Sequence, residues 1–375
     1  MRRCYVLVLV VFAWRVFSFQ TTSNIPLPPK LQTIYRQQKI TTVAMAGDST
    51  EEVSPAEVAP LISLDSNLWN TSLDETNSSL AEVQLVGQKV VNALQTSGFL
   101  RIQSDLIPCE LQQAALQDAT NWLTSESALG EDSMVIRHPT DPKTYVMLDV
   151  SRIEEEKANK SGPAQFTPKL LQYWNACEDV KKCVLRAIGV GLKLHHPEDL
   201  ASWHAKGSHS AMRLLHYPPA TPTTGNRCKA HSDYGTVTLL SNDGVSGLEI
   251  FLRGRWWPVP HVPGTMVVNI GSLLSNWTKR GEGEGEHPLL ATVHRVAGPA
   301  SENSACDPVV LQEAMLQGRT SIAFFADPDD GSPLSLENGM TIEEYINWRS
   351  GGNCADRSGV AFTDLEKSIL EFGPT

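Results

Sequence analysis

A histidine and an aspartate two residues apart, in the segment 229–235, have the residue types of a metal-ligand pair. In an extended strand, residues i and i+2 project from the same face, so His231 and Asp233 are expected to point at one spot. His294, in the β-rich run 291–296, is a second histidine that a distant strand can bring to this spot. Two imidazole nitrogens and one carboxylate on one face leave three coordination positions open, as in non-haem Fe(II) sites that admit further ligands.

A second pair with the same spacing, Arg319 and Ser321, opens the apolar run 321–325. The strand rule again puts both side chains on one face, where a guanidinium fork and a hydroxyl together suit a carboxylate. Tyr217 would add a further hydroxyl. Either pair alone is a weak signal, because an isolated Arg-x-Ser is more often part of a surface ion pair. The chain also contains His196-Pro-Glu198, which is predicted to be a loop without a metal role.

The elements that must position these side chains fall into two parts. After residue 210, short β-rich runs alternate with Gly and Pro turns, which predicts an antiparallel sandwich or barrel. The runs cover residues 212–217, 235–240, 247–252, 256–259, 265–270, 291–296 and 321–325. Before residue 200, apolar residues at helical spacing predict three helices, at 80–94, 110–123 and 167–192. Strands are predicted at 60–65 and 99–102, and loops at 66–79 and around 147–162.

Composition excludes several classes of protein. The 375 residues carry a net charge of −11 and no dominant basic patch, so nucleic acid is not expected as a partner. The seven cysteines form no CxxC pair, which predicts reduced thiols rather than disulfides or a zinc ribbon. The chain also lacks an HExxH motif, which disfavours a zinc hydrolase.

The N-terminus has the composition of a targeting leader. Arg2 and Arg3 precede an apolar run at 4–14, and no acidic residue occurs before Asp48. We predict a presequence at 1–47, signal-like and then transit-like, which would direct the protein to a plastid. A secretory signal or a membrane anchor is the alternative. A polar linker at 48–59 would follow, and the mature protein is expected to be a monomer without a stable membrane anchor.

Several motifs occur in the order found in one enzyme family. After His231-x-Asp233 come Gly247-Leu-Glu-Ile, the segments 255–260 and 263–271, His294-Arg-Val and Arg319-x-Ser321. Over roughly residues 58–328 the chain resembles the isopenicillin N synthase-like, plant-type 2-oxoglutarate dioxygenases. The resemblance implies a mainly β fold with flanking helices, in which a double-stranded β-helix (jelly-roll) core at 201–330 follows a helical, mixed N-terminal region at 60–200. A C-terminal tail, 331–375, would complete the chain.

The resemblance also implies an activity. Fe(II) would bind to His231, Asp233 and His294, and 2-oxoglutarate would bind through its distal carboxylate to Tyr217, Arg319 and Ser321. With O2, such an enzyme oxidises a small organic metabolite by hydroxylation, desaturation or ring chemistry, and releases succinate and CO2. Ascorbate is an optional further cofactor.

The chain departs from the family pattern at four places. Residues 295–318 put 24 positions between the second histidine and the arginine, where the family has fewer, and a Gly-Glu run lengthens the preceding loop. We expect both to remodel the cavity mouth. Leu215 replaces a usual Asn, and Ser272 replaces a usual Asp. Two alternatives stay open: an oxidase of this family that does not use 2-oxoglutarate, and a non-catalytic jelly-roll binding protein.

Overall fold

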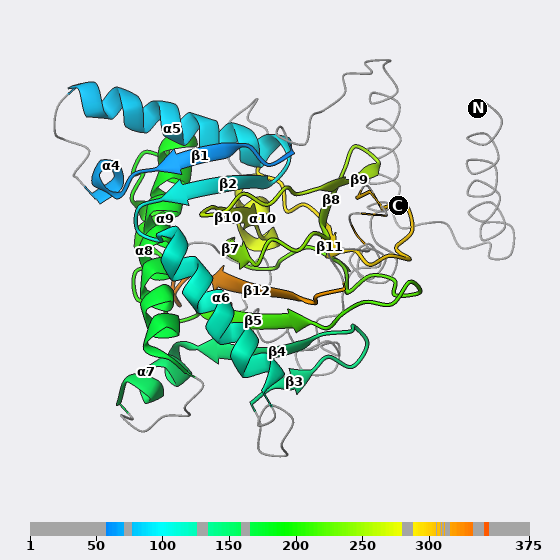
Figure 1. Ribbon diagram of the computed structural model, residues 1–375. Helices are drawn as coiled ribbons and strands as arrows, with labels where there is room; N and C mark the ends of the chain where they lie inside the picture. Colours follow the sequence, from blue (N-terminus) through cyan, green and yellow to red (C-terminus); the bar gives the residue numbers. More distant parts are fainter. Residues whose placement is uncertain are drawn as a thin grey trace, which may run out of the picture. The chain divides into compact units, whose positions relative to one another are not determined.

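Two β-sheets carry the site in the computed structural model (Figure 1). The structure describes residues 58–70, 77–125, 134–158, 166–279, 288–304, 306, 307, 309, 311, 316–332 and 341–344. All of them belong to one compact unit, Val53–Thr375. The predicted presequence, the 281–286 run and most of the C-terminal tail lie outside the described residues, and the predicted domain limits stay predictions.

The larger sheet has eight strands in the order β1-β2-β10-β7-β12-β5-β4-β3. Only β1 and β2 pair in parallel, and the other neighbours are antiparallel. The strands are β1 (Leu61–Leu64), β2 (Phe99–Ser104), β3 (Ile136–Arg137), β4 (Thr144–Asp149), β5 (Ala211–Tyr217), β7 (Val237–Asn242), β10 (Met266–Ile270) and β12 (Arg319–Ala326).

The smaller sheet has the order β6-β11-β8-β9 and is antiparallel throughout. Its strands are β6 (Cys228–His231), β8 (Leu248–Leu252), β9 (Arg255–Pro258) and β11 (His294–Val296). These two sheets confirm the predicted mainly β, jelly-roll fold with flanking helices. No described helix is long and apolar enough to cross a membrane.

Helices cover the outer face of the larger sheet, beside β5, β7 and β12 (Figure 1). The described helices are α4 (Ser66–Asn70), α5 (Asn77–Thr96), α6 (Cys109–Thr124), α7 (Val150–Ala158), α8 (Pro168–Gly191), α9 (Asp199–Ser202) and α10 (Ser272–Lys279). Of these, α6 and α8 make the contacts with β5, β7 and β12, while α5 lies against β1 and β2, and α7 lies against β4. Trp174 of α8 packs edge-on against Phe324 of β12, with ring centroids 5.2 Å apart. Because side chains alternate along a strand, the neighbouring residues Ala323 and Phe325 face the other way, towards the interior between the sheets.

Two predicted loops are wrong. Residues 66–79 contain α4 and the start of α5, and residues 147–162 contain the end of β4 and all of α7. The polar residues that suggested loops act partly as helix caps. Asp65 accepts a hydrogen bond from the backbone N–H of Asn67 (2.9 Å), and Asp149 accepts one from the backbone N–H of Arg152 (2.9 Å). The short strands β3 and β4 were not predicted either.

The cysteine prediction is confirmed for the part of the chain that the structure describes. Cys109, Cys177, Cys183, Cys228 and Cys306 are all free thiols. The remaining two, Cys4 and Cys354, lie outside the described residues.

Candidate metal centre

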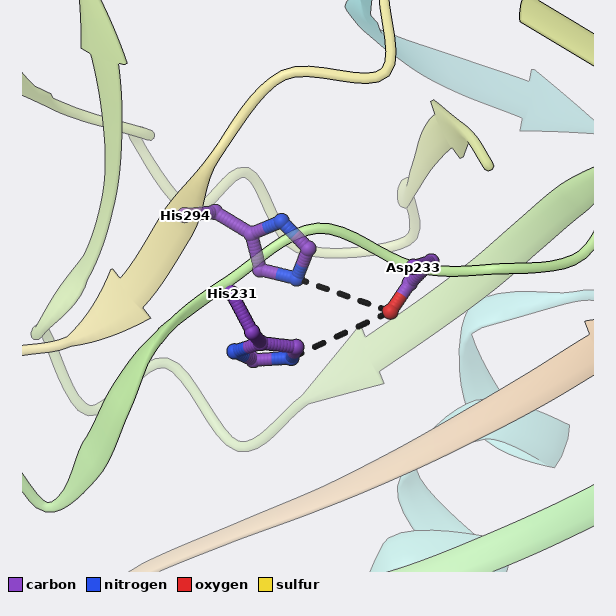
Figure 2. A group of neighbouring side chains, drawn as sticks. All are labelled: His231, Asp233 and His294. Atoms are coloured by element: carbon purple, nitrogen blue, oxygen red, sulfur yellow. Dashed lines mark ion pairs between the residues drawn. The ribbon is translucent and has the colours of Figure 1, made fainter. Parts of the chain in front are cut away.

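The smaller sheet brings the two candidate histidines together. His294 on β11 pairs directly with His231 at the end of β6, and their ring centroids are 4.4 Å apart. Asp233 lies two residues beyond the end of β6, so the chain delivers it to the same place. Its Oδ1 atom is 3.8 Å from Nε2 of each histidine (Figure 2). In the described part of the chain, these three residues are the one His/Cys/Asp/Glu group whose ligand atoms converge closely enough to hold a metal ion.

Backbone carbonyls fix the orientation of both rings. Nδ1 of His231 lies 2.8 Å from the carbonyl oxygen of Lys229, and Nδ1 of His294 lies 3.2 Å from that of Thr292. A carbonyl only accepts, so each Nδ1 carries the proton and donates it. Each Nε2 is therefore left with a free lone pair that points at the shared spot, which is the tautomer that a metal ligand requires.

The larger sheet holds the aspartate. Oδ2 of Asp233 accepts hydrogen bonds from Thr238 Oγ1 of β7 (2.6 Å) and from Asn269 Nδ2 of β10 (2.7 Å). Its backbone carbonyl accepts a third from the N–H of Ser272 (2.8 Å), at the start of α10. Because Oδ2 is occupied, Oδ1 is the oxygen that remains for a metal. Ser272 thus contributes through its backbone, which is independent of the side chain that replaces the family's Asp.

Electrostatics favour the protonation states that a cation needs at Asp233 and His294, whereas His231 must lose a proton. Burial alone would raise the pKa of Asp233, but His294, His231 and the two hydrogen bonds to Oδ2 lower it below its usual value. Burial, and then the charge of His231, lower the pKa of His294 to about 4. Burial lowers the pKa of His231, but the Cys228 thiol and Asp233 raise it to about 9, so a metal ion must displace this proton. Once His231 has released this proton, the donor set is an ionised carboxylate and two nitrogens with inward lone pairs, which fits Fe(II).

A second acid lies close to this centre. Asp327 is 3% exposed, and its Oδ1 atom has no hydrogen-bond partner within the described ranges. Burial, and then the charge of Asp233, raise its pKa to about 7. Gly235 leaves the space that the Asp327 carboxylate occupies, because a Cβ there would overlap Oδ1. Nothing in the sequence pattern singled out Asp327.

The metal ligands open into a cavity of about 440 Å³ between the two sheets. All six residues that the sequence singled out line this cavity: Tyr217, His231, Asp233, His294, Arg319 and Ser321. Arg319 on β12 is in register with Tyr217 on β5, and its guanidinium lies 5.4 Å from the centre of the Tyr217 ring. Nη1 of Arg319 donates to Oγ of Ser321 (3.0 Å). The roles of these residues in binding stay predictions.

The departures from the family pattern have different consequences. Leu215 lines the cavity in the position of the missing amide, so that part of the wall is apolar. The described residues of the long insertion lie against the smaller sheet instead, where Ser304 Oγ donates to Glu249 (2.5 Å) and Glu302 accepts from Arg295 (2.9 Å). No described residue between 297 and 318 lines the cavity, and the remodelled mouth stays a prediction.

The sequence missed four cavity residues. Thr238 and Asn269 orient Asp233, and the buried pair Asp141 and Lys143 (3.0 Å) lies at the cavity wall. Asn269 lies within the segment 263–271, which is one of the family-like motifs, and this was the available signal. The other three depend on strand pairings that no local pattern shows.

Residues 208–328 match the model of the 2OG-Fe(II) oxygenase superfamily. This part of the chain is therefore similar to 2OG-Fe(II) oxygenases. All six candidate residues fall within the matched region, residues 208–328. Membership in the plant-type subgroup stays a prediction.

Individual relatives agree with the family match. The chain is 34% identical over 183 residues to the 2-oxoglutarate-dependent dioxygenase htyE of Aspergillus rugulosus, covering 46% of this chain and 51% of that one. It is 31% identical to the proline hydroxylase buaE of Petromyces alliaceus, covering 49% and 55%. The chain thus spans about half the length of these curated relatives.

A solved structure shows the same fold. Dioxygenase for auxin oxidation 1 of Arabidopsis thaliana, in complex with 2-oxoglutarate, superposes with a TM-score of 0.53. The alignment covers 75% of this chain and 99% of that one, at 17% identity. At this identity, the likeness extends to the fold alone.

Proposed function

We propose that the protein is an Fe(II)- and 2-oxoglutarate-dependent dioxygenase that oxidises a small organic metabolite and releases succinate and CO2. One observation carries the proposal: His231, Asp233 and His294 converge with their other polar atoms already hydrogen-bonded, in the cavity that Arg319 also lines. Relatives described as 2-oxoglutarate-dependent dioxygenases support it.

Each group in the cavity has a task in this reaction. Fe(II), when bound, supplies the activation of O2 that drives the decarboxylation of 2-oxoglutarate and the oxidation of substrate. The triad would hold the metal on one face and leave its other face open to 2-oxoglutarate and O2. Arg319 is 1% exposed, so its fork would meet the distal carboxylate of 2-oxoglutarate in a place from which water is largely excluded. Ser321 and Tyr217 would complete that contact.

A succinate assay tests the activity. Protein reconstituted with Fe(II) is supplied with 2-oxoglutarate, O2 and pools of small metabolites, with and without ascorbate, and succinate is measured. We expect succinate to depend on a metabolite pool and to disappear in Asp233→Ala. Substrate oxidation that proceeds equally well without 2-oxoglutarate would favour the alternative, an oxidase of the same fold. Protein that binds no Fe(II) would favour a non-catalytic binding protein.

We also propose that residues 1–47 direct the protein to a plastid. The support is compositional: the leader is basic and free of acidic residues. A fluorescent protein fused after residue 50 should enter plastids of an alga with secondary plastids. Secretion of the fusion would instead support the alternative secretory signal.

A further inference from the structure

Arg213 is a cavity residue that the proposed chemistry of iron and 2-oxoglutarate does not use. It lies on β5, on the same strand face as Leu215 and Tyr217, and all three line the cavity. Its guanidinium lies between two rings, 5.2 Å from the centre of Tyr145 and 5.4 Å from that of Phe325. Two flanking rings leave the edges of the guanidinium as the places where a ligand can bind.

The charge of Arg213 has no counterpart in the cavity. Two acids line the cavity in the described part of the chain, and both are engaged elsewhere. Asp141 pairs with Lys143 (3.0 Å), and Asp233 belongs to the metal centre. Nε of Arg213 is buried and has no hydrogen-bond partner among the described residues. A buried charge without a counterpart costs free energy, so an anion that binds the guanidinium from the cavity would lower this cost.

An anion at Arg213 would occupy a different place from the 2-oxoglutarate carboxylate proposed for Arg319. The two arginines lie at opposite ends of one paired stretch: Arg319 opposes Tyr217, and Arg213 opposes Ala323. Four residues along a strand separate these positions by roughly 13 Å. Thr238, which holds Asp233, lies on β7, and only β12 separates β7 from β5. Thr238 opposes Phe325 and Arg213 opposes Ala323, so Arg213 lies two strand spacings to the side of Thr238 and two residues along the strand, roughly 12 Å away.

We propose that Arg213 anchors the substrate, and that the substrate is a small carboxylic acid. The planar fork of one arginine, held between Tyr145 and Phe325, matches a planar carboxylate in two-point contact. The distance to the metal centre then requires a molecule whose oxidised carbon lies several bonds from its acid group. The inference rests on the proposed function, because it concerns the second ligand of that same cavity.

A binding experiment tests the anchor without knowledge of the substrate. In protein loaded with Zn(II) and saturated with 2-oxoglutarate, the ¹⁵N–¹H resonance of Arg213 Nε is identified by its loss in Arg213→Lys. Sodium butyrate, up to tens of millimolar, should shift this resonance saturably, and butyramide should not. No shift with butyrate, or an equal shift with butyramide, would overturn the proposal. This readout does not need turnover, so it separates failure of the anchor from failure of the proposed activity.

Turnover supplies the second test. Pools of carboxylic acids are compared with pools of the corresponding carboxamides in the succinate assay. We expect turnover with an acid, loss of it with the amide, and an increase of about ten- to a hundredfold in the substrate KM of Arg213→Gln at unchanged affinity for 2-oxoglutarate. Arg255→Gln is the matched control, because Arg255 stacks on Trp257 (3.6 Å) and is not among the cavity residues. Turnover of amides as fast as acids, or a weakened affinity for 2-oxoglutarate in Arg213→Gln, would refute the assignment.

Discussion

The two ends of the cavity are built in opposite ways. At the metal end, the protein itself satisfies the polar atoms that do not face the metal: two carbonyls hold the histidines, and Thr238 and Asn269 hold Asp233. At the arginine end, Arg319 has two protein contacts, Ser321 Oγ and the Val245 carbonyl. Arg213, at the other end of the same β5–β12 pairing, has a buried Nε with no partner in the described residues. The difference indicates a preformed metal site beside a pocket that its ligands complete.

The largest expected effect comes from the metal end. Asp233→Ala removes the only anionic ligand, so bound Fe(II) and all succinate formation should be lost. Metal analysis after desalting measures the bound iron. Asp179→Ala is the control, because Asp179 is exposed and pairs with Lys182. Retention of one iron per chain in the double variant His231→Ala/His294→Ala would contradict the assignment of the ligands.

Substitutions of Arg319 should weaken the binding of 2-oxoglutarate and leave the binding of iron unchanged. Arg319→Gln should raise the apparent constant for 2-oxoglutarate by about ten- to a hundredfold, because a charge-assisted contact is lost in a buried place. Arg319→Lys should recover only part of the loss, since an ammonium cannot match the fork. Iron affinity, measured in parallel, should hardly change. A large loss of iron in Arg319→Gln would show that the two ends are not separate.

Removing a support at the metal end should have an intermediate effect. Asn269→Ala leaves Oδ2 of Asp233 with Thr238 as its remaining side-chain donor, so the carboxylate is held less firmly. Losses of this kind typically weaken metal binding by roughly ten- to a hundredfold. Competition with a coloured chelator measures the constant for Mn(II). Unchanged affinity in both Asn269→Ala and Thr238→Val would mean that the site does not depend on preorganisation.

Asp327 lies near the metal end but has a carboxylate oxygen without a hydrogen-bond partner in the described residues. We expect the smallest effect from its substitution. Its pKa in the folded protein is raised to about 7 from a usual value of 3.8, so between these values the folded state holds a proton that the unfolded state has lost. The free energy of unfolding of metal-free protein should therefore fall as pH rises from about 4 to 7. Urea unfolding at several pH values should show a shallower fall in Asp327→Asn. An equal slope in the variant would remove Asp327 as the cause.

The sequence predicts those parts of the fold that rest on local periodicity. The helices α5, α6 and α8 and most strands of both sheets follow from apolar spacing. The three metal ligands were predicted correctly as a group, but the strand expected to continue to Asp233 ends at His231, and the chain beyond β6 brings Asp233 to the site. The helices α4 and α7 were missed, because their N-terminal polar residues are the same types that favour loops.

The supports of the site depend on long-range pairing. Thr238 and Asn269 reach Asp233 only because β7 and β10 are neighbours in the larger sheet. Arg213 faces the cavity because β5 pairs with both β4 and β12, which places Tyr145 and Phe325 beside it. The sequence of one strand does not indicate which strand will lie next to it, so these contacts become visible only in the structure.

One titration tests the central claim most directly. 2-Oxoglutarate is titrated calorimetrically into metal-free and Mn(II)-loaded protein, and Mn(II) is titrated with and without 2-oxoglutarate. If the open face of the triad and Arg319 hold one molecule of 2-oxoglutarate together, each ligand should tighten the binding of the other by the same factor, at one site per chain. Asp233→Ala should abolish this coupling, and Arg319→Gln should weaken 2-oxoglutarate binding. Equal affinity for 2-oxoglutarate with and without metal would contradict the account.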